Sequence, residues 1–227
     1  MIKFENVRKK FGNGVVALTD INLLIDDGEF VFLVGPSGAG KTTLFRLLTK
    51  EILPTTGKIS VDELNLDKLP KGKIPLLRRR VATAFQDIKL INERTIRENV
   101  GLVLEILNKP EKEVKKETGK TLELVGLAKR AELFPLQLSG GEIQRAAIAR
   151  AMVAKPSVLL ADEPTGNLDP TTSWEILKLL EEINKAGITV IIATHNAEIV
   201  NSLKKRVISL CGGKIVKDEK EGKYETF

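Results

Sequence analysis

Short apolar runs bounded by turn residues recur along the chain and predict two kinds of strand. Residues 30–34, 158–161 and 188–193 are almost continuously apolar, which is typical of buried strands in a parallel sheet. Residues 2–8 and 15–25 alternate between apolar and polar positions, which is typical of strands with one covered face. The sequence therefore predicts an α/β fold with an antiparallel β subdomain near the N-terminus.

The apolar spacing becomes helical between residues 88 and 150. Thr95 and Glu98 form the capping-box pattern of a helix start, and residues 111–125 are charged with helical spacing. Ser139 opens a further helix. We therefore predict a single domain in which an α-helical subdomain is inserted into an α/β core. The domain spans 1–227, its core 1–87 and 151–227, and its helical subdomain 88–150.

Several expectations concern the C-terminal part of the chain. Thr172 and Glu175 repeat the capping-box pattern and predict a helix that begins there. Residues 206–216 predict a hairpin around two glycines. Residues 218–227 are polar, and we expect them to fray. Cys211 lies in an apolar run and is expected to be a buried, inert thiol.

Composition narrows the class of protein without identifying it. The 227 residues are 42% hydrophobic and 29% charged, as in a globular domain. No stretch approaches the roughly 18 apolar residues of a membrane span, and the charged N-terminus does not resemble a signal peptide. We therefore expect a cytoplasmic protein. One cysteine and one histidine exclude an internal disulfide, a cysteine-based metal cluster and a histidine-rich metal site.

The formal net charge of +6 permits nucleic acid, anionic lipid or nucleotide as a partner. Most basic residues are scattered among acidic ones. The tightest basic clusters are Arg78–Arg80 and Lys115–Lys116. Two interpretations of such clusters stay open at this point: a solvated surface, or a patch that faces lipid or a protein partner.

Residues 35–42 read Gly-Pro-Ser-Gly-Ala-Gly-Lys-Thr and match the phosphate-binding P-loop. A predicted buried strand precedes the loop and a helical pattern follows it, as the motif requires. Glycines let several backbone N–H groups point at one anion, and the helix adds its positive end. Lys41 can reach the β- and γ-phosphates, and the Thr42 hydroxyl can hold Mg²⁺. The predicted nucleotide-binding residues are Gly35, Pro36, Ser37, Gly38, Ala39, Gly40, Lys41, Thr42 and Thr43.

Two carboxylates, Asp162 and Glu163, follow the apolar run 158–161. Asp162 can hold Mg²⁺, directly or through water, and Glu163 can polarise the water that attacks a γ-phosphate. Alone, such a pair usually marks a strand that leaves the core. Together with an upstream P-loop it indicates a P-loop NTPase core of the RecA-like kind.

Residues 138–142, Leu-Ser-Gly-Gly-Glu, resemble the signature of ATP-binding-cassette (ABC) ATPases. Ser139 and Glu142 also form an ordinary capping box, and both interpretations can hold because a helix start can bind an anion. The resemblance implies a homodimer that sandwiches two ATP molecules, with each signature closing the partner's P-loop. The signature residues that would contact ATP are Ser139, Gly140, Gly141 and Glu142.

The resemblance covers essentially the whole chain and assigns further positions. Gln86 matches a glutamine that senses Mg²⁺ and the γ-phosphate, and Asp169 matches a loop that crosses the dimer interface. His195 matches a histidine that contacts the γ-phosphate. Phe11 matches an aromatic residue that stacks on adenine, with Val16 packing nearby. The implied catalytic residues are Lys41, Gln86, Glu163 and His195, and the implied Mg²⁺ ligands are Thr42, Gln86 and Asp162.

Residues 162–169 resemble a branch of the family that serves cell division, lipoprotein release and macrolide efflux. The stretches 28–44, 85–100 and 134–142 look most like the cell-division members, in which ATP cycling inside the cell controls cell-wall hydrolases outside it. An exporter of lipoproteins or small molecules is the alternative. Cassettes associated with nucleic acid carry a long coiled coil or a second cassette, so no specific nucleic-acid partner is expected.

The same resemblance implies a peripheral position on the inner face of the cell membrane. An integral membrane partner would contact the segment after Gln86, residues 87–99. The apolar side chains of Ile88, Leu90 and Ile91 would be hard to explain as free surface. Packing within the helical subdomain is the alternative, and the sequence does not decide between the two.

Overall fold

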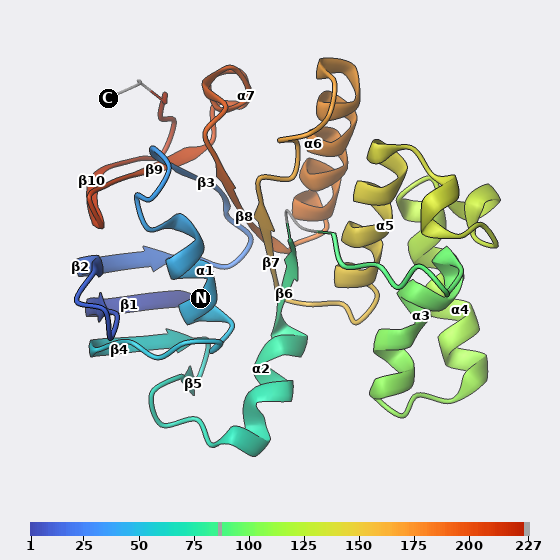
Figure 1. The fold of residues 1–227 in the computed structure, drawn as a ribbon, viewed down its shortest axis with the longest axis horizontal. Helices are drawn as coiled ribbons and strands as arrows, with labels where there is room; N and C mark the ends of the chain where they lie inside the picture. The colour runs from blue at the N-terminus through green and yellow to red at the C-terminus, as the bar shows by residue number, and fades with distance from the viewer. Residues whose placement is uncertain (86–87, 225–227) are drawn as a thin grey trace.

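Two β-sheets form the framework of the computed structural model, which describes residues 1–85 and 88–224 (Figure 1). The smaller sheet is antiparallel, with the strand order β2-β1-β4-β5. Buried and exposed residues alternate over much of its two long strands, as expected for a sheet with one covered face. Its strands are β1 (Ile2–Lys10), β2 (Val16–Ile25), β4 (Thr56–Val61) and β5 (Leu64–Asn65).

The larger sheet has the strand order β10-β9-β3-β8-β7-β6, and only the β10–β9 pair is antiparallel. Val34 pairs with Thr194, and Asp162 pairs with Ala193. This register places the carboxyl ends of β3, β7 and β8 at one edge of the sheet. Its strands are β3 (Phe30–Val34), β6 (Val81–Ala84), β7 (Val158–Asp162), β8 (Thr189–Thr194), β9 (Arg206–Cys211) and β10 (Lys214–Glu219).

Helices α3, α4 and α5 pack on one another and form a helical lobe beside the larger sheet, at the right of Figure 1. The α-helices are α1 (Lys41–Leu48), α2 (Ile74–Arg80), α3 (Ile96–Ile106), α4 (Glu111–Leu124), α5 (Gly140–Met152), α6 (Pro170–Lys185) and α7 (Ala197–Leu203). Short 3₁₀ helices span Lys71–Lys73, Ala128–Arg130 and Pro135–Gln137. No helix in the described part of the chain is long and apolar enough to cross a membrane.

Strand β3 explains why a continuous apolar run is needed at the centre of the fold. Phe30 and Phe32 face one hydrophobic cluster, which continues into helices α3, α5 and α6. Val31 and Leu33 face a second cluster, which joins the smaller sheet to α1. Because successive side chains of a strand point to opposite faces, both faces must be apolar when both are covered.

The predicted α/β class, with its antiparallel β part and inserted helices, is confirmed. The predicted start of the helix at Thr172 was wrong, because α6 begins at Pro170. Asp169 caps this helix by accepting a hydrogen bond from the backbone N–H of Thr172 at 3.0 Å. Proline at the first helical position favours this earlier start. Helices α2 and α7 were not predicted, because each is only seven residues long.

The expectation of a frayed C-terminal segment was also wrong for its described residues. Asp218 belongs to β10, and the backbone N–H of Gly222 donates to the carbonyl of Lys205 at 3.1 Å. Tyr224 is only 7% exposed. The polar composition of residues 218–227 did not indicate that Tyr224 would be buried and would anchor the segment. Cys211 is half-buried, so the expectation of a buried thiol was wrong as well.

Candidate nucleotide-binding and hydrolysis site

The P-loop joins the end of β3 to the start of α1, and its shape depends on glycine. Gly35, Gly38 and Gly40 have φ angles of 145°, 78° and 111°, a region that residues with side chains rarely adopt. A Cβ at Gly35 would lie 2.1 Å from the carbonyl oxygen of Leu210. The loop therefore requires glycine for steric as well as conformational reasons. The open backbone N–H groups at the start of α1 complete an anion-binding site.

Lys41, the first residue of α1, lies against the loop that precedes it. Its Nζ donates to the carbonyl oxygens of Gly35 at 2.6 Å and Pro36 at 3.2 Å, and the residue is 9% exposed. Burial lowers the pKa of Lys41, while the carboxylates of Glu163 and Asp162 act in the opposite direction. The loop carbonyls thus hold the ammonium group of Lys41 against the P-loop.

Thr42 and Asp162 bring two oxygen ligands together beside the P-loop. The Thr42 hydroxyl donates to Oδ2 of Asp162 at 3.2 Å. Burial raises the pKa of Asp162, and the hydrogen bond from Thr42 partly opposes that shift. Mg²⁺ prefers oxygen ligands and is commonly held by one or two carboxylates together with substrate phosphates. The donor set of this edge therefore fits a magnesium–nucleotide complex.

Glu163 and His195 form a hydrogen-bonded pair at the same edge. Nδ1 of His195 lies 2.7 Å from Oε1 of Glu163, and the side chains are 68% and 12% exposed. Glu163 has a φ of 46°, an uncommon conformation for a residue with a side chain. Its backbone N–H donates to the carbonyl of Ala193 at 2.8 Å, which ties it to β8. Such strain is often found where a side chain must be aimed at a functional site.

Most of these residues line one cavity of about 610 Å³, although Gly35 does not. The cavity brings together groups that are more than 150 positions apart in the sequence, because the carboxyl ends of parallel strands share one edge. Ala17 and Tyr224 complete its wall, and sequence reasoning missed both. The lining residues are Ala17, Pro36, Ser37, Gly38, Ala39, Gly40, Lys41, Thr42, Thr43, Asp162, Glu163, His195 and Tyr224.

Tyr224 is anchored by Asn201 on α7, the helix that follows His195. The backbone N–H of Tyr224 donates to Oδ1 of Asn201 at 2.7 Å, and Nδ2 of Asn201 donates to the carbonyl of Tyr224 at 3.4 Å. Tyr224 also packs in the core that includes Ile199 and Val200 of this helix. The C-terminal segment therefore contributes one wall of the cavity and supports the helix next to it.

Replacement of Tyr224 by alanine is expected to raise the KM for ATP by about three- to tenfold, because one wall of the cavity is lost. Tyr224→Phe keeps the ring and is expected to stay close to wild type. Steady-state ATPase assays of the two variants provide the measurement. An unchanged KM in Tyr224→Ala would show that the tyrosine does not contribute to the nucleotide site.

The structure does not place every predicted ligand of the nucleotide in this cavity. Phe11 and Val16 are not among its lining residues. Nζ of Lys9 lies 5.1 Å from the centre of the Phe11 ring, so this aromatic face already has a cationic neighbour. The stacking role of Phe11 stays a prediction. Gln86 lies outside the described residues.

The signature segment caps α5 and lies away from the P-loop cavity. The Ser139 Oγ donates to Oε2 of Glu142 at 3.0 Å, and the backbone N–H of Glu142 donates to Ser139 Oγ at 3.4 Å. The backbone N–H of Ser139 also donates to Oε2 of Glu142, at 2.9 Å. This bond is the largest cause that lowers the pKa of Glu142, and the bond from the Ser139 hydroxyl lowers it further. A Cβ at Gly141 would lie 2.3 Å from Cγ2 of Thr172 on α6. Glycine therefore lets α5 approach α6 closely, while the helix start stays exposed.

None of the described signature residues 139–142 lines the P-loop cavity of the same chain. Asp169, the other predicted interface residue, caps α6 and belongs to an exposed loop. Hydrogen bonds from Thr172 lower the pKa of Asp169 and keep its carboxylate charged. An exposed helix start is thus present in the signature segment, and it does not line the P-loop cavity of its own chain.

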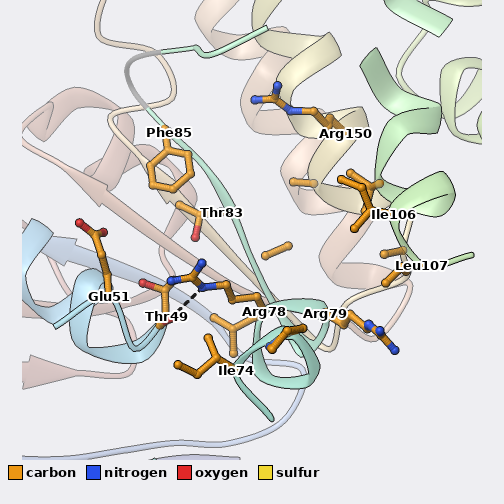
Figure 2. A pocket seen from close by; sticks show the side chains of 16 residues that line it. Thr49, Glu51, Ile74, Arg78, Arg79, Thr83, Phe85, Ile106, Leu107 and Arg150 are labelled. Carbon is orange, nitrogen blue, oxygen red and sulfur yellow. Dashed lines mark hydrogen bonds between the residues drawn. The ribbon is translucent and has the colours of Figure 1, made fainter. Parts of the chain in front are cut away.

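A larger cavity of about 900 Å³ lies between residues of the α/β core and residues of the helical lobe (Figure 2). Phe85 follows β6, and Ile106 lies at the end of α3; they are 47% and 69% exposed. Arg78, Arg79 and Arg150 outnumber Glu51 in the lining of the same cavity and give it a basic character (Figure 2). Nε of Arg78 donates to the carbonyl of Thr49 at 3.3 Å. We call this cavity the groove. Its lining combines exposed apolar side chains with cations, which is typical of a protein-docking surface.

The predicted contact segment after Gln86 is described from Ile88 onward. Asn99 is fully buried and holds the segment, since its Nδ2 donates to the carbonyls of Ile91 and Arg94, each at 3.0 Å. Leu90 packs against the main hydrophobic cluster, so the packing alternative applies to it. Ile91 is 36% exposed. The segment is thus fixed by a buried amide while it keeps one apolar side chain at the surface.

A P-loop followed by a carboxylate pair, with a distant signature at the start of α5, is the arrangement of an ABC nucleotide-binding cassette. The ABC transporter family matches residues 18–166 of this sequence. The chain belongs to this family and is an ABC-type ATPase. The P-loop, the signature and the Asp162–Glu163 pair follow one another in this order along the chain.

Among its relatives are proteins of one particular kind. The chain is 49% identical over 227 residues to the cell division ATP-binding protein FtsE of Bacillus subtilis (strain 168), covering 100% of both chains. It is 43% identical over 213 residues to FtsE of Escherichia coli (strain K12), covering 94% of this chain and 96% of that protein. A solved dimeric cassette, MJ0796 bound to ADP and Pi in a post-hydrolysis state, is 35% identical with a TM-score of 0.88 and coverages of 99% and 100%.

Proposed function

We propose that this chain has the function of its FtsE relatives: the ATPase subunit of a membrane complex in cell division, with an FtsX-like integral membrane protein as its partner. The observation that carries this proposal is the 49% identity to a cell division ATP-binding protein over the full length of both chains. In this function, ATP-driven movement of the cassettes is transmitted through the membrane partner to regulators of cell-wall hydrolases. The chain would then work as a peripheral protein on the inner face of the membrane.

The site residues divide the chemistry of ATP hydrolysis between them. The P-loop backbone and Lys41 would bind the β- and γ-phosphates. Glu163 would accept a proton from the attacking water. His195, whose Nδ1 lies 2.7 Å from Oε1 of Glu163, would orient Glu163 and contact the γ-phosphate. Positioning and charge neutralisation would supply most of the rate enhancement. Thr42 and Asp162, joined by Gln86 in the family pattern, would hold Mg²⁺, whose charge stabilises the phosphate oxygens when bound.

The second anion site supports a head-to-tail homodimer. Ser139 and Gly140 form the exposed start of α5, and neither residue lines the P-loop cavity of its own chain. The solved cassette MJ0796, similar over 99% of this chain, is a dimer. We infer that the signature of one subunit closes the P-loop cavity of the other, with Asp169 near the interface. Two ATP molecules would then be sandwiched in each dimer.

The groove supports the docking of the membrane partner. It lies between two parts of the molecule and is lined by exposed apolar and basic side chains (Figure 2). A short cytoplasmic helix with apolar and acidic residues would complement such a lining. The fixed segment around Ile91 lies in the part of the chain that follows Gln86, where the family pattern places the partner. Closure of the cassette dimer could then move the docked helix.

Affinity purification from membranes tests the proposed function. The wild-type chain is expected to recover an integral membrane protein with an FtsX-like architecture, and Ile106→Glu is expected to lower its recovery at least about tenfold, because a charge would be buried in the groove. Leu124→Glu is the matched control, since Leu124 on α4 is 49% exposed and lies outside the groove.

The identity of the recovered protein separates the alternatives. If the recovered membrane protein has the architecture of a lipoprotein-release or macrolide-efflux partner, the chain serves export and not cell division. Recovery that is unchanged in Ile106→Glu would show that the partner docks elsewhere.

A further inference from the structure

We propose that the segment 68–76, which leads into α2, binds the anionic headgroups of membrane phospholipids. Residues 68–80 contain three lysines and three arginines and no acidic residue, although the whole chain has 36 basic and 30 acidic residues. The cluster Arg78–Arg80 forms the C-terminal part of this run. The proposed function does not account for its three lysines, Lys68, Lys71 and Lys73.

The arginines of this run already have partners or a place in the groove. Arg78 and Arg79 line the groove, and Arg80 forms an ion pair with Asp62 at 3.4 Å. The lysines are different. Lys68, Lys71 and Lys73 are exposed, and none of them lines the groove. Among residues 1–85 and 88–224, no carboxylate forms an ion pair with any of these lysines.

The backbone of the segment is well fixed, although its lysine side chains are free to extend. Leu69 is buried, and its carbonyl accepts a hydrogen bond from Nζ of Lys50 at 2.5 Å. The backbone N–H of Lys73 donates to the carbonyl of Pro70 at 2.9 Å, which forms the short 3₁₀ turn before α2. Leu77 is fully buried and anchors α2. The three lysine side chains therefore extend from a backbone that hydrogen bonds and buried leucines hold in place.

An apolar side chain accompanies the lysines. Leu76 is 38% exposed and does not line the groove, so a partner in the groove would leave it uncovered. Three exposed lysines and an exposed leucine within residues 68–76 suit a membrane surface, where the charges meet headgroups and the leucine meets the acyl boundary. Nucleic acid would satisfy the charges but not the leucine. The acidic neighbours of the segment, Glu63 and Asp67, lie before Lys68 and not among the three lysines.

The location of the segment agrees with this ligand. It adjoins the groove through Ile74 and Pro75, and it lies with α2 at the lower edge of the molecule in Figure 1. The orientation toward the membrane depends on the proposed docking of an integral partner in the groove. Binding of the purified chain to lipid does not, so the two proposals can fail separately.

Flotation of the purified full chain with vesicles tests the proposal. Vesicles of phosphatidylcholine with phosphatidylglycerol are expected to bind the chain, and pure phosphatidylcholine vesicles are not. A Lys68→Gln, Lys71→Gln, Lys73→Gln triple variant is expected to bind the anionic vesicles on the order of 100-fold more weakly at low salt. The estimate allows about fivefold for each lysine near a charged surface.

The matched control is Lys112→Gln, Lys116→Gln, Lys129→Gln, which lowers the net charge by the same amount at exposed lysines of the helical lobe. It is expected to keep most of the vesicle binding, and both triple variants should keep wild-type ATPase activity in solution. Equal loss of binding in both variants would overturn the proposal, because only net charge would matter. Absence of binding to anionic vesicles, or displacement of the chain from them by duplex DNA at equal phosphate concentration, would also overturn it.

Discussion

Glu163→Gln is expected to lower the turnover of ATP by about 10²-fold or more while ATP binding is retained. The amide keeps the size of the side chain but cannot accept the proton of the attacking water. Glutamine can also keep the hydrogen bond to His195, which spans 2.7 Å in the wild type. Because the change affects the reaction more than the binding of ATP, the variant should accumulate as an ATP-bound dimer. Phosphate release and nucleotide binding, measured on the same preparation, provide the test.

Glu198→Gln provides the control for this prediction. Glu198 lies in the first turn of α7, close to His195 in sequence, but it does not line the P-loop cavity. Its removal also lowers the negative charge of this region by one, and turnover is expected to stay near the wild-type value. Near-normal turnover in Glu163→Gln would refute the role of Glu163 as general base. Loss of ATP binding in that variant would instead indicate a role in holding the nucleotide.

A mixture of two inactive variants is expected to regain about one quarter of the wild-type ATPase rate. Lys41→Ala removes the ammonium group of the P-loop, and Ser139→Arg places a bulky cation at the signature. Each variant alone should be nearly inactive, because every site in its dimers is defective. In random mixing about half of the dimers are mixed, and each of these has one intact site of two.

This expectation follows from the proposed homodimer. Residues 139–142 do not line the P-loop cavity of their own subunit, so in the proposed dimer an intact site would combine Lys41 of one copy with Ser139 of the other. Titration of one variant into the other, followed by ATPase activity, should give a maximum near equal amounts. If the mixture stays inactive while Ser139→Arg alone hydrolyses ATP at the full rate, the shared site is wrong.

The sequence by itself determined the class of fold and most of the chemistry. Apolar runs such as 30–34 and 158–161 predict buried strands because a strand covered on both faces has no room for polar side chains. The P-loop and the Asp162–Glu163 pair are local patterns whose backbone and spacing requirements are written in consecutive residues. A capping box such as Ser139 with Glu142 is equally local, and the structure contains it.

Only the tertiary structure decided which residues that are distant in the sequence contact one another, and where the C-terminal segment packs. The register of β3, β7 and β8 brings Thr42 to Asp162 and Glu163 to His195, a result of sheet pairing that no local pattern contains. Tyr224 reaches the cavity because its polar segment is anchored on α7, although its composition suggested fraying. Long-range packing sets these contacts, since their free energy depends on neighbours that are far away in the sequence and close only in the folded chain.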